Sequence, residues 1–419
     1  MRITIFGAGS QGDILPCVRL GRGLQQAGWQ VLLAAPQNFG GMIQEAGLPF
    51  HPLRGDVQQI MAGETGQQYM ESGGGNPLQS IRAMRKMLGA VALPMAKDAL
   101  EACGQADALV SLAVFAPLAA TIAEICAIPL ILTEPTPVLP TGDFPAPGWP
   151  VQRNLGRLHN RLSGVAMLEV IWQWYRPFVN EFRRQYGLGR LNSADFRRVL
   201  NAGPLLGAYS PAVIRHPTDW PQNVHITGYW FQDGHTDWQP PDELADFLRR
   251  GKPPVYVGFG SMAGRKPGHF AEIVLEALVQ TGQRGILATG WGGLDVGKIP
   301  ENLFVLDSAP HGWLFPRMAA VVHHGGAGTT GEALRAGKPG VIVPFIVDQL
   351  FWGKRVAALG AGTEPIPAKK LTPARLAEAI RRVTSDSAMQ QRAEAVGREI
   401  RTENGVESAV ALVRDFLRA

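Results

Sequence analysis

The sequence predicts an α/β protein built from two tandem, doubly wound domains, each with a parallel sheet, that face each other across a cleft. Three observations lead to this prediction. The chain has 419 residues, too many for one ordinary domain. Short apolar strands alternate with helical segments from the N-terminus onward, an order that produces parallel sheets. The same order starts again after a stretch rich in proline and tryptophan at residues 216–241.

The N-terminal half begins with a strand, a glycine loop and a helix. We predict a strand at Ile3–Phe6, a helix at Ile14–Ala27 and a second strand at Val31–Ala35. Gly28 provides a natural C-cap for the helix. Residues 134–149 are rich in proline, threonine and glycine and are expected to form a long ordered loop, a kind of segment that often carries function.

The remaining strands and the closing helix are predicted from apolar runs of matching length. The closing helix covers Val406–Leu417, which has apolar residues along one face. The predicted domain bounds are 1–215, a linker at 216–241, 242–400, and a C-terminal helix at 401–419 that packs back toward the N-terminal domain. The further strands are expected at residues 108–113, 129–133, 254–259, 284–288, 302–307, 319–323 and 340–344.

Composition and charge exclude several classes of protein. Hydrophobic residues make up 46% of the chain and charged residues 18%, which suits large cores and not a disordered chain. The net charge of +5 is mild for this length, so a nucleic-acid binder is not expected. No signal peptide is visible, and residues 109–132 are interrupted by prolines and a glutamate, so a soluble protein is expected. The three cysteines form no CxxC pair, which fits a cytoplasmic location.

The first glycine loop, Gly7–Gly12, follows a strand and matches GxGxxG. A dinucleotide site would also need an acidic residue at the end of the second strand, and Val31–Gln37 has none. The loop can instead turn backbone amides of Ser10, Gln11 and Gly12 and a helix N-terminus toward a ligand. It also places Asp13 at the mouth of the cleft, where we expect an exposed catalytic carboxylate; the alternative is that Asp13 only caps its helix.

The second glycine run, His323–Glu332, follows the strand at 319–323 and is expected to open a short helix at Thr330–Ala336. Glycines let backbone amides approach an anion, and the threonine hydroxyls and the helix N-terminus add donors. This predicts a diphosphate cradle, with Glu332 one turn further on as a partner for ribose hydroxyls. The predicted cradle residues are His324, Gly325, Gly326, Gly328, Thr329 and Thr330.

Two further features bear on ligands of the C-terminal domain. Asp348 and Gln349 follow the predicted strand at 340–344 and suit sugar hydroxyls, because a carboxylate accepts hydrogen bonds and an amide both accepts and donates. A helix cap for the next segment is the alternative. Adjacent histidines on a strand point to opposite faces, so His323 and His324 are not expected to share a metal ion, and no metal site is predicted.

These segments together resemble the family of inverting, nucleotide-sugar-dependent glycosyltransferases, over nearly the whole chain. The nearest subgroup is the sterol and antibiotic glycosyltransferase type, to which TGYWF at Thr227–Phe231 is also similar. The resemblance implies the GT-B fold, two Rossmann-like domains across a cleft. The segments that carry it are GSQGDILP (Gly9–Pro16), GFGSM (Gly258–Met262), GWGG (Gly290–Gly293), APHGWLF (Ala309–Phe315), HHGGAGTTGEALRAGKP (His323–Pro339) and PFIVDQ (Pro344–Gln349).

The resemblance implies roles for individual residues. The N-terminal domain would bind the acceptor and the C-terminal domain the nucleotide-sugar donor. Asp13 would be the general base, while Ser10 and Ser261 would lie near the diphosphate that His324–Thr330 hold. Glu332 would bind ribose, and Asp348 and Gln349 the donor sugar. Trp291 and the loop with Ala309, Pro310 and His311 would flank the nucleobase. Related enzymes often have arginine where this chain has Gln11, so a charge contribution from that position is missing.

The implied activity is transfer of a hexose, with glucose as the default, from a UDP-sugar or TDP-sugar to a hydroxyl of a sterol, polyketide or other small apolar acceptor. No metal and no further cofactor would be required. A nucleotide-sugar epimerase of the same fold and a non-catalytic nucleotide-sugar or lipid binder are the alternatives. Acceptor lining is expected in Met61–Met95, Glu134–Trp149 and Trp172–Tyr175. The arginines of residues 153–198 could form a weak peripheral membrane contact or an ordinary solvated helix face.

Overall fold

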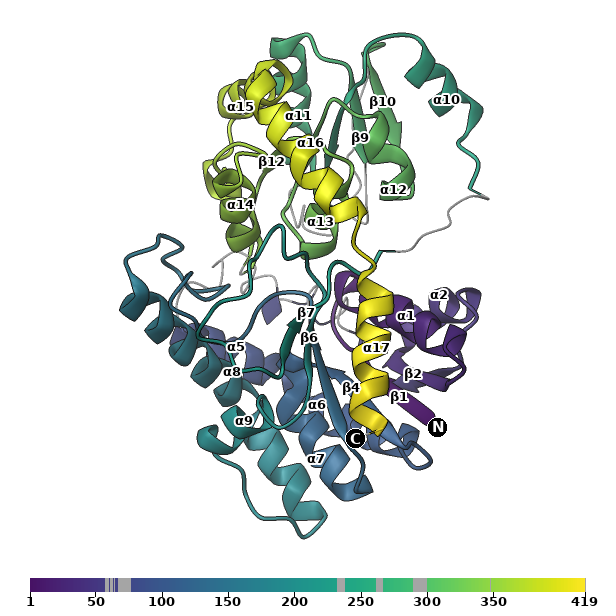
Figure 1. The fold of residues 1–419 in the computed structure, drawn as a ribbon. Coiled ribbons are helices and arrows are strands. Elements are labelled where there is room, and N and C mark those ends of the chain that lie inside the picture. Colours follow the sequence, from purple (N-terminus) through teal and green to yellow (C-terminus); the bar gives the residue numbers. More distant parts are fainter. Residues whose placement is uncertain are drawn as a thin grey trace. The chain divides into compact units, whose positions relative to one another are not determined.

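The computed structural model describes residues 1–56, 60, 63, 65–66, 77–231, 238–260, 267–288, 300–346 and 348–418. The chain divides into two compact units. The first unit contains Met1–Pro211, Arg215–Phe231 and Asn404–Ala419, and the second contains Ala212–Ile214 and Gln232–Glu403. Each unit is built around one parallel sheet with helices on its faces, which confirms the predicted α/β class (Figure 1).

The first unit contains a seven-stranded parallel sheet with the order β3-β2-β1-β4-β5-β6-β7. The strand order reverses between β1 and β4, which pair in register from Ile3 opposite Ala108 to Phe6 opposite Ser111. The strands are β1 (Arg2–Phe6), β2 (Gln30–Pro36), β3 (Phe50–Leu53), β4 (Ala108–Leu112), β5 (Leu130–Glu134), β6 (Leu205–Gly207) and β7 (Val224–Ile226). The helices of four or more residues are α1 (Gln11–Gln26), α2 (Gly40–Glu45), α5 (Pro77–Leu88), α6 (Ala92–Ala102), α7 (Ala116–Cys126), α8 (Arg157–Gln185), α9 (Ser193–Val199) and α17 (Gly405–Arg418).

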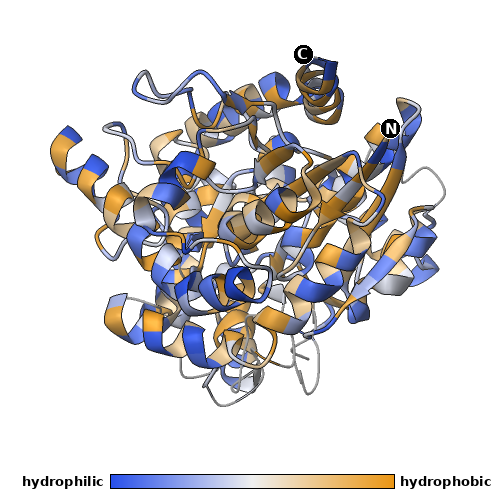
Figure 2. Ribbon diagram, turned by 90° about the horizontal axis from the view of Figure 1, so that it is seen from below, coloured by the Kyte–Doolittle hydropathy of each residue, from blue (hydrophilic) through white to orange (hydrophobic). Residues whose placement is uncertain are grey.

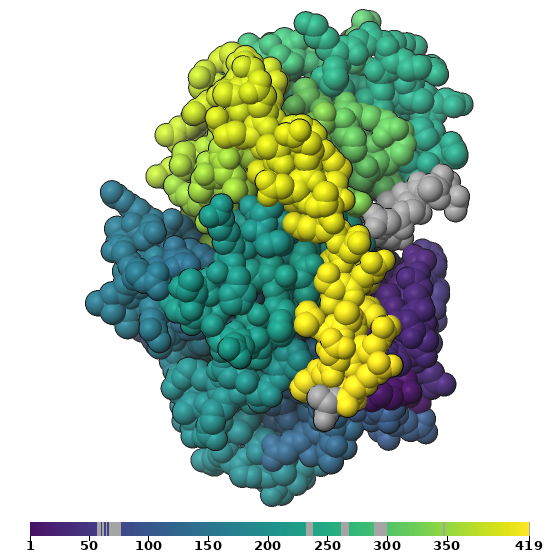
Figure 3. All heavy atoms as spheres, viewed as in Figure 1, coloured from purple at the N-terminus to yellow at the C-terminus, as the bar shows by residue number. Residues whose placement is uncertain are grey.

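Two parts of the first unit come from outside the predicted N-terminal domain. Residues 216–231, predicted as linker, belong to this unit, because β7 extends its sheet beside β6. Helix α17 returns to the unit and lies beside α1 (Figures 1 and 3). The approach is close, since a Cβ at Gly23 of α1 would collide with Val406 of α17.

The second unit contains a five-stranded parallel sheet with the order β10-β9-β8-β11-β12. Its order reverses between β8 and β11, the pair that carries His323 opposite Gly258. The strands are β8 (Val255–Gly258), β9 (Gly285–Ala288), β10 (Leu303–Leu306), β11 (Ala320–His323) and β12 (Gly340–Ile342). The helices of four or more residues are α10 (Asp242–Arg249), α11 (Pro267–Thr281), α12 (His311–Leu314), α13 (Ala327–Arg335), α14 (Gln349–Ala358), α15 (Pro373–Ser385) and α16 (Ser387–Arg401).

Alternation along β8 divides the core of the second unit into two layers. Val255 and Val257 pack on one face with residues of α11 and α15, while Tyr256 packs on the other with residues of α10 and η5 (Phe315–Arg317). Several helices carry hydrophobic residues along one side and hydrophilic residues along the other (Figure 2). Burial of these apolar faces against the sheet holds both ends of each strand in place, which positions the loops that follow the strands.

Candidate functional site

Both glycine motifs follow strands at which the strand order of a sheet reverses. β1 ends at Phe6 and is followed by Gly7, and β11 ends at His323 and is followed by His324 and Gly325. Ligands of open parallel sheets bind outside the carboxyl ends of the strands at such positions. Each unit therefore presents one glycine motif where a ligand site is expected.

Asp13 lies in the first turn of α1 and is half-buried, not exposed as the sequence suggested. Its Oδ2 accepts hydrogen bonds from the backbone N–H of Ser10 at 2.7 Å and from the Ser10 hydroxyl at 2.9 Å. Burial raises the pKa of the Asp13 carboxyl, and the two hydrogen bonds from Ser10 oppose this change. Ser10, Gln11 and Gly12 are exposed around it.

One aromatic residue of α8, Tyr175, lies near the same carboxylate. Burial, and then the charge of Asp13 nearby, raise the pKa of the Tyr175 hydroxyl. The Tyr175 ring packs edge-on against Phe115 with centroids 5.8 Å apart, and Phe115 packs against Phe6 at the end of β1. One of the residues predicted to line the acceptor site is therefore a neighbour of Asp13. Trp172 and Trp174 of the same predicted group are buried.

The second motif opens α13 three residues earlier than the sequence predicted. Gly326 is the N-cap with extended backbone, and α13 begins at Ala327. The N–H groups of the first helical turn have no partner within the helix. Gly328 is exposed and Thr329 half-buried, so this turn remains accessible in the second unit. Helix N-termini of this kind bind anions.

His323 and His324 have different roles although they are adjacent. The His323 side chain is buried, and its Nδ1 accepts a hydrogen bond from the N–H of Gly325 at 3.1 Å, which stabilises the turn. Burial lowers the pKa of His324 to about 4, so this ring is neutral near pH 7. A neutral imidazole carries one N–H that it can donate to a phosphate oxygen.

Gly326 makes room for the ring of His324. A Cβ at Gly326 would lie 2.6 Å from Nε2 of His324, which is too close for a real side chain. Gly325 has φ +92°, and a Cβ there would lie 2.9 Å from the backbone oxygen of Gln349. The two glycines therefore bring His324, the start of α13 and the start of α14 together.

The structure assigns Thr330 a different hydrogen bond from the predicted one. Thr330 is fully buried, and its hydroxyl donates to the carbonyl oxygen of Gly326 at 2.9 Å, the ordinary contact of a threonine with the preceding helical turn. Its single O–H therefore donates to the N-cap residue of α13 and not to a ligand. Glu332 is 8% exposed and lies near α12, because a Cβ at Gly312 would be 3.8 Å from Glu332 Oε2. This places Glu332 beside the loop with Ala309 and His311, whose imidazole stacks on Phe315 at 4.3 Å.

Asp348 and Gln349 stand at the start of α14. Asp348 occupies the N-cap position, but its side chain makes no capping hydrogen bond. Gln349 is buried, and its amide oxygen accepts hydrogen bonds from the backbone N–H groups of Phe345 and Ile346 at 2.8 and 3.1 Å. The amide oxygen thus shapes the loop after β12.

Sequence reasoning missed a buried carboxylate in the first unit. Glu134, at the end of β5, is 1% exposed, and it accepts hydrogen bonds from the Tyr209 hydroxyl at 2.6 Å and from the N–H of Val138 at 3.0 Å. Burial raises its pKa to about 7. The signal was an acidic residue that closes the apolar strand LILTE, but its partner lies 75 residues away along the chain.

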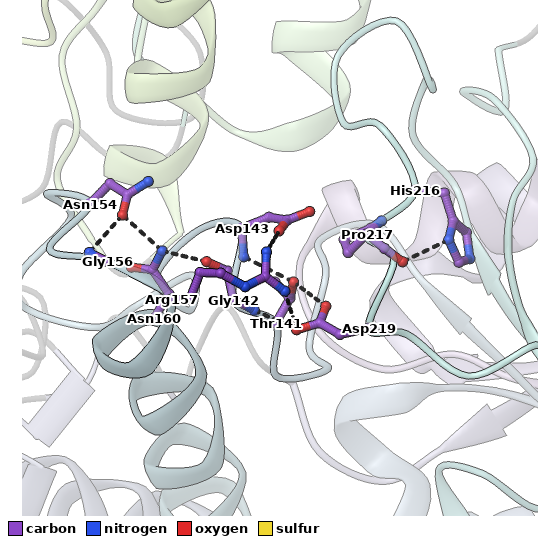
Figure 4. Close-up of polar contacts among 10 residues, drawn as sticks. All are labelled: Thr141, Gly142, Asp143, Asn154, Gly156, Arg157, Asn160, His216, Pro217 and Asp219. Carbon is purple, nitrogen blue, oxygen red and sulfur yellow. Dashed lines mark hydrogen bonds and ion pairs between the residues drawn. The ribbon is translucent and has the colours of Figure 1, made fainter.

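The loop at 134–149 is held in the middle by a second carboxylate. Asp219 accepts hydrogen bonds from the Thr141 hydroxyl and from the N–H of Gly142, both at 2.7 Å (Figure 4). Arg157, at the start of α8, forms ion pairs with Asp143 at 2.8 Å and with Asp219 at 3.5 Å. The predicted acceptor loop is therefore ordered by contacts with α8 and with residues near β7.

Some predicted residues lie outside the described part of the chain. These are Ser261, Trp291, Met61 and Met70. Among the described residues, no group of three or more His, Cys, Asp or Glu side chains could hold a metal ion. In the same part of the chain, no helix has the length and apolar character needed to cross a membrane.

Family models match both units. Residues 3–142 match the glycosyltransferase family 28 N-terminal domain, and residues 272–411 match the C-terminal domain of the erythromycin biosynthesis protein CIII-like family. The first match covers the motif around Asp13 and the second covers the motif around α13.

Two curated relatives align with almost the whole chain. O-mycaminosyltylonolide 6-deoxyallosyltransferase of Streptomyces fradiae is 36% identical over 437 residues, which cover 99% of this chain and 97% of the relative. A sterol 3-beta-glucosyltransferase of Arabidopsis thaliana is 34% identical over 430 residues, which cover 98% of this chain and 67% of the relative. A second Arabidopsis sterol glucosyltransferase is covered over 64% of its length, so this chain spans about two thirds of these plant enzymes.

The fold agrees with this relationship. The crystal structure of the kitacinnamycin glycosyltransferase superposes with a TM-score of 0.74 at 20% identity, over 99% of both chains. Together with the motifs at the ends of β1 and β11, these similarities show that the chain belongs to the family of sterol and antibiotic glycosyltransferases with the GT-B fold.

Proposed function

We propose that this chain transfers a hexose, with glucose as the first choice, from UDP-sugar or TDP-sugar to a hydroxyl of a small apolar acceptor, with inversion at the anomeric carbon. One observation carries this proposal most strongly. The first unit holds a carboxylate that, among the described residues, has no ion-pair partner, while the second holds a neutral histidine beside an accessible helix start. A base and an anion site are the two groups that such a transfer needs.

Asp13 acts as the general base in this proposal. The acceptor oxygen forms a bond to the anomeric carbon as its proton passes to the Asp13 carboxylate. The bond between the anomeric carbon and the diphosphate oxygen breaks at the same time, and its electron pair leaves with the diphosphate. A carboxyl group is a much weaker base than an alkoxide, so the proton moves late, when the acceptor oxygen has become acidic. Such assistance contributes about 10²- to 10⁴-fold in rate.

The start of α13 receives the charge that develops on the diphosphate. The amides of Ala327, Gly328 and Thr329 and the N–H of His324 supply donors that are fixed before the reaction begins. The helix dipole adds positive potential at this end. Because these groups can stabilise the leaving group without an added cation, we propose that no metal ion is required, and treatment with EDTA is expected to leave turnover within twofold.

The Asp13→Asn variant tests the proposal. It keeps the size of the side chain and removes the base, so turnover should fall by about 10²- to 10⁴-fold while UDP and TDP bind with unchanged affinity. Turnover is read by mass shift over a panel of donors crossed with sterols, polyketides and flavonoids, and binding by calorimetry. An Asp13→Asn enzyme with wild-type turnover would contradict the assignment.

Incubation with donor alone separates the alternatives. A nucleotide-sugar epimerase would convert the donor without an acceptor, and a non-catalytic binder would hold the nucleotide without turnover on any alcohol. We expect no change of the donor sugar until an acceptor is added. Formation of an epimeric nucleotide sugar in this control would replace the transferase proposal.

An exposed apolar stripe supports a weak contact with membranes that contain an apolar acceptor. Leu155, Leu158 and Leu162 are 56%, 73% and 57% exposed; Leu155 precedes α8, and Leu158 and Leu162 lie on successive turns of it. Arg153 and Arg161 are exposed beside them. Such a face suits an anionic lipid surface. Flotation with anionic vesicles at low salt should recover the wild-type protein and less of a Leu158→Ser/Leu162→Ser variant; equal recovery would exclude this contact.

A further inference from the structure

Both hydrogen-bond donors of Ser10 are directed to one atom. Its backbone N–H and its hydroxyl donate to Oδ2 of Asp13, at 2.7 and 2.9 Å. Serine has one N–H and one O–H, so it has no donor left for a phosphate oxygen. Among the residues that the structure describes, none donates to the other oxygen, Oδ1. The carboxylate is thus held by one oxygen, and its second oxygen remains available.

The same carboxylate occupies the space where a side chain at position 9 would lie. Its φ of +124° is a conformation that side chains rarely adopt. A Cβ at this position would collide with Oδ2 of Asp13 and lie 2.7 Å from its Cγ. The second glycine of the GxGxxG pattern therefore makes room for a side chain of its own helix. This differs from a dinucleotide site, where that glycine lets the backbone approach a pyrophosphate.

Helix α9 offers a matched comparison within the same unit. The N–H of its N-cap residue also donates to the carboxylate three residues further on, from Asn192 to Asp195 Oδ2 at 2.8 Å, but the Asn192 side chain accepts hydrogen bonds from backbone N–H groups and gives none to Asp195. Asp195 also forms an ion pair at 2.5 Å with Arg198, three residues further along the helix. The equivalent position in α1 is Pro16, which has no charge and cannot pair with Asp13. The charge of Asp195 is balanced by Arg198, whereas the charge of Asp13 is stabilised by hydrogen bonds from Ser10.

The ionisation of Asp13 depends on two opposing effects. Burial raises the pKa of the Asp13 carboxyl, and the hydrogen bonds from the Ser10 N–H and hydroxyl lower it. Without the hydroxyl, one of the two hydrogen bonds that lower this pKa would be lost, and the pKa of Asp13 would rise further. A general base must be ionised before it can accept a proton, so the Ser10 hydroxyl affects both the orientation and the ionisation of Asp13.

We propose that Ser10 is a positioning residue for the transfer reaction: its hydroxyl orients Asp13 and keeps it ionised, and does not bind the donor diphosphate. Gly9 is part of the same arrangement, because only glycine leaves room for the carboxylate. This inference rests on the proposed function, since it takes Asp13 as the base.

The Ser10→Ala variant provides the test, because it removes the hydroxyl and keeps the backbone donor. The hydroxyl favours the ionised carboxylate, so its loss should raise the pKa of Asp13 and move the acidic limb of the kcat profile to higher pH by about one unit. On the acidic side, kcat should fall about tenfold. The Kd values of UDP and TDP should stay within twofold, and Ser10→Thr, which keeps a hydroxyl, should restore the wild-type pH profile.

Two further variants make each outcome decisive. Asn192→Ala removes the side-chain cap of α9, in which the Asn192 amide oxygen accepts from the N–H groups of Ala194 and Asp195, and should lower the melting temperature without moving the pH profile. A Ser10→Ala enzyme that behaves in the same way, or that binds UDP tenfold more weakly with an unmoved acidic limb, overturns the positioning role. Asp13→Asn is measured alongside. If it turns over like the wild type, the proposed function itself fails; if it is inactive and Ser10→Ala is silent, only the role of Ser10 fails.

Discussion

The two glycine motifs occupy the same place in their sheets but are used differently. In the first, Gly9 leaves room for the carboxylate of Asp13, a side chain of the helix that the loop begins. In the second, Gly326 leaves room for the His324 ring, a side chain of the loop residue directly after β11. The first arrangement presents an acid, and the second leaves the first turn of α13 accessible. A glycine pattern after a strand therefore does not by itself indicate a phosphate site, because the collision that each glycine avoids decides its use.

The largest effect is expected at Gly9. In the Gly9→Ala variant, the new Cβ would displace the Asp13 carboxylate, so kcat should fall by a hundredfold or more while nucleotide affinity stays within twofold. Gly41→Ala is the control, since Gly41 lies in α2 with no atom within contact distance of a new Cβ. Circular dichroism verifies that both variants fold. If a folded Gly9→Ala enzyme binds nucleotide more weakly, the first motif also contributes to nucleotide binding, and the proposed difference between the two motifs is wrong.

Gly326 should give the opposite pattern. A Cβ in Gly326→Ala would push the His324 ring away from the start of α13, so the Kd of UDP or TDP should rise about tenfold. At saturating donor, kcat should change less than Kd. Titration calorimetry measures this, with Gly268→Ala of α11 as the matched control because its new Cβ would meet no atom. If Gly326→Ala binds nucleotide as the wild type does, the second motif is not the anion site.

The neutral state of His324 predicts a pH-independent contribution to binding. Because burial lowers the pKa of His324 to about 4, the ring gains no charge between pH 5.5 and 8. The wild type should bind UDP several-fold more tightly than His324→Gln, by a ratio that is constant over this range. Titration of the nucleotide phosphates affects binding to both proteins equally, so it does not change the ratio of the two affinities. A ratio that grows as the pH falls toward 5.5 would mean that His324 binds the phosphate as a cation.

The smallest effect concerns Glu134, a carboxylate of the first unit that lies outside the glycine motif. Its pKa is raised from 4.5 to about 7, so the folded state holds this proton more tightly than the unfolded state does. Stability from this group should therefore fall as the pH rises from about 4.5 to 7. Glu134→Gln should flatten that dependence, with changes of a few degrees in melting temperature across the window. An unchanged slope would show that Glu134 does not titrate there.

Elements with a local pattern were predicted well from sequence alone. The strand at β1, the helix after it and the second strand agree with the structure within three residues, because apolar periodicity is a property of neighbouring residues. The predicted start of α13 was three residues late. Glycines allow several backbone conformations, so sequence alone could not tell the loop from the first turn.

The side-chain roles depended on the tertiary structure. The sequence by itself determined the strand–glycine–helix order, the residues of both motifs and the family to which they point. Only the fold decided that β7, in the segment predicted as a linker, joins the first sheet and that Glu134 meets Tyr209. It also decided that the Ser10 hydroxyl donates to Asp13 and the Thr330 hydroxyl to Gly326. The reason is physical: periodicity depends only on residues that are near one another in the sequence, whereas burial and the choice of hydrogen-bond partner depend on how the chain packs in three dimensions.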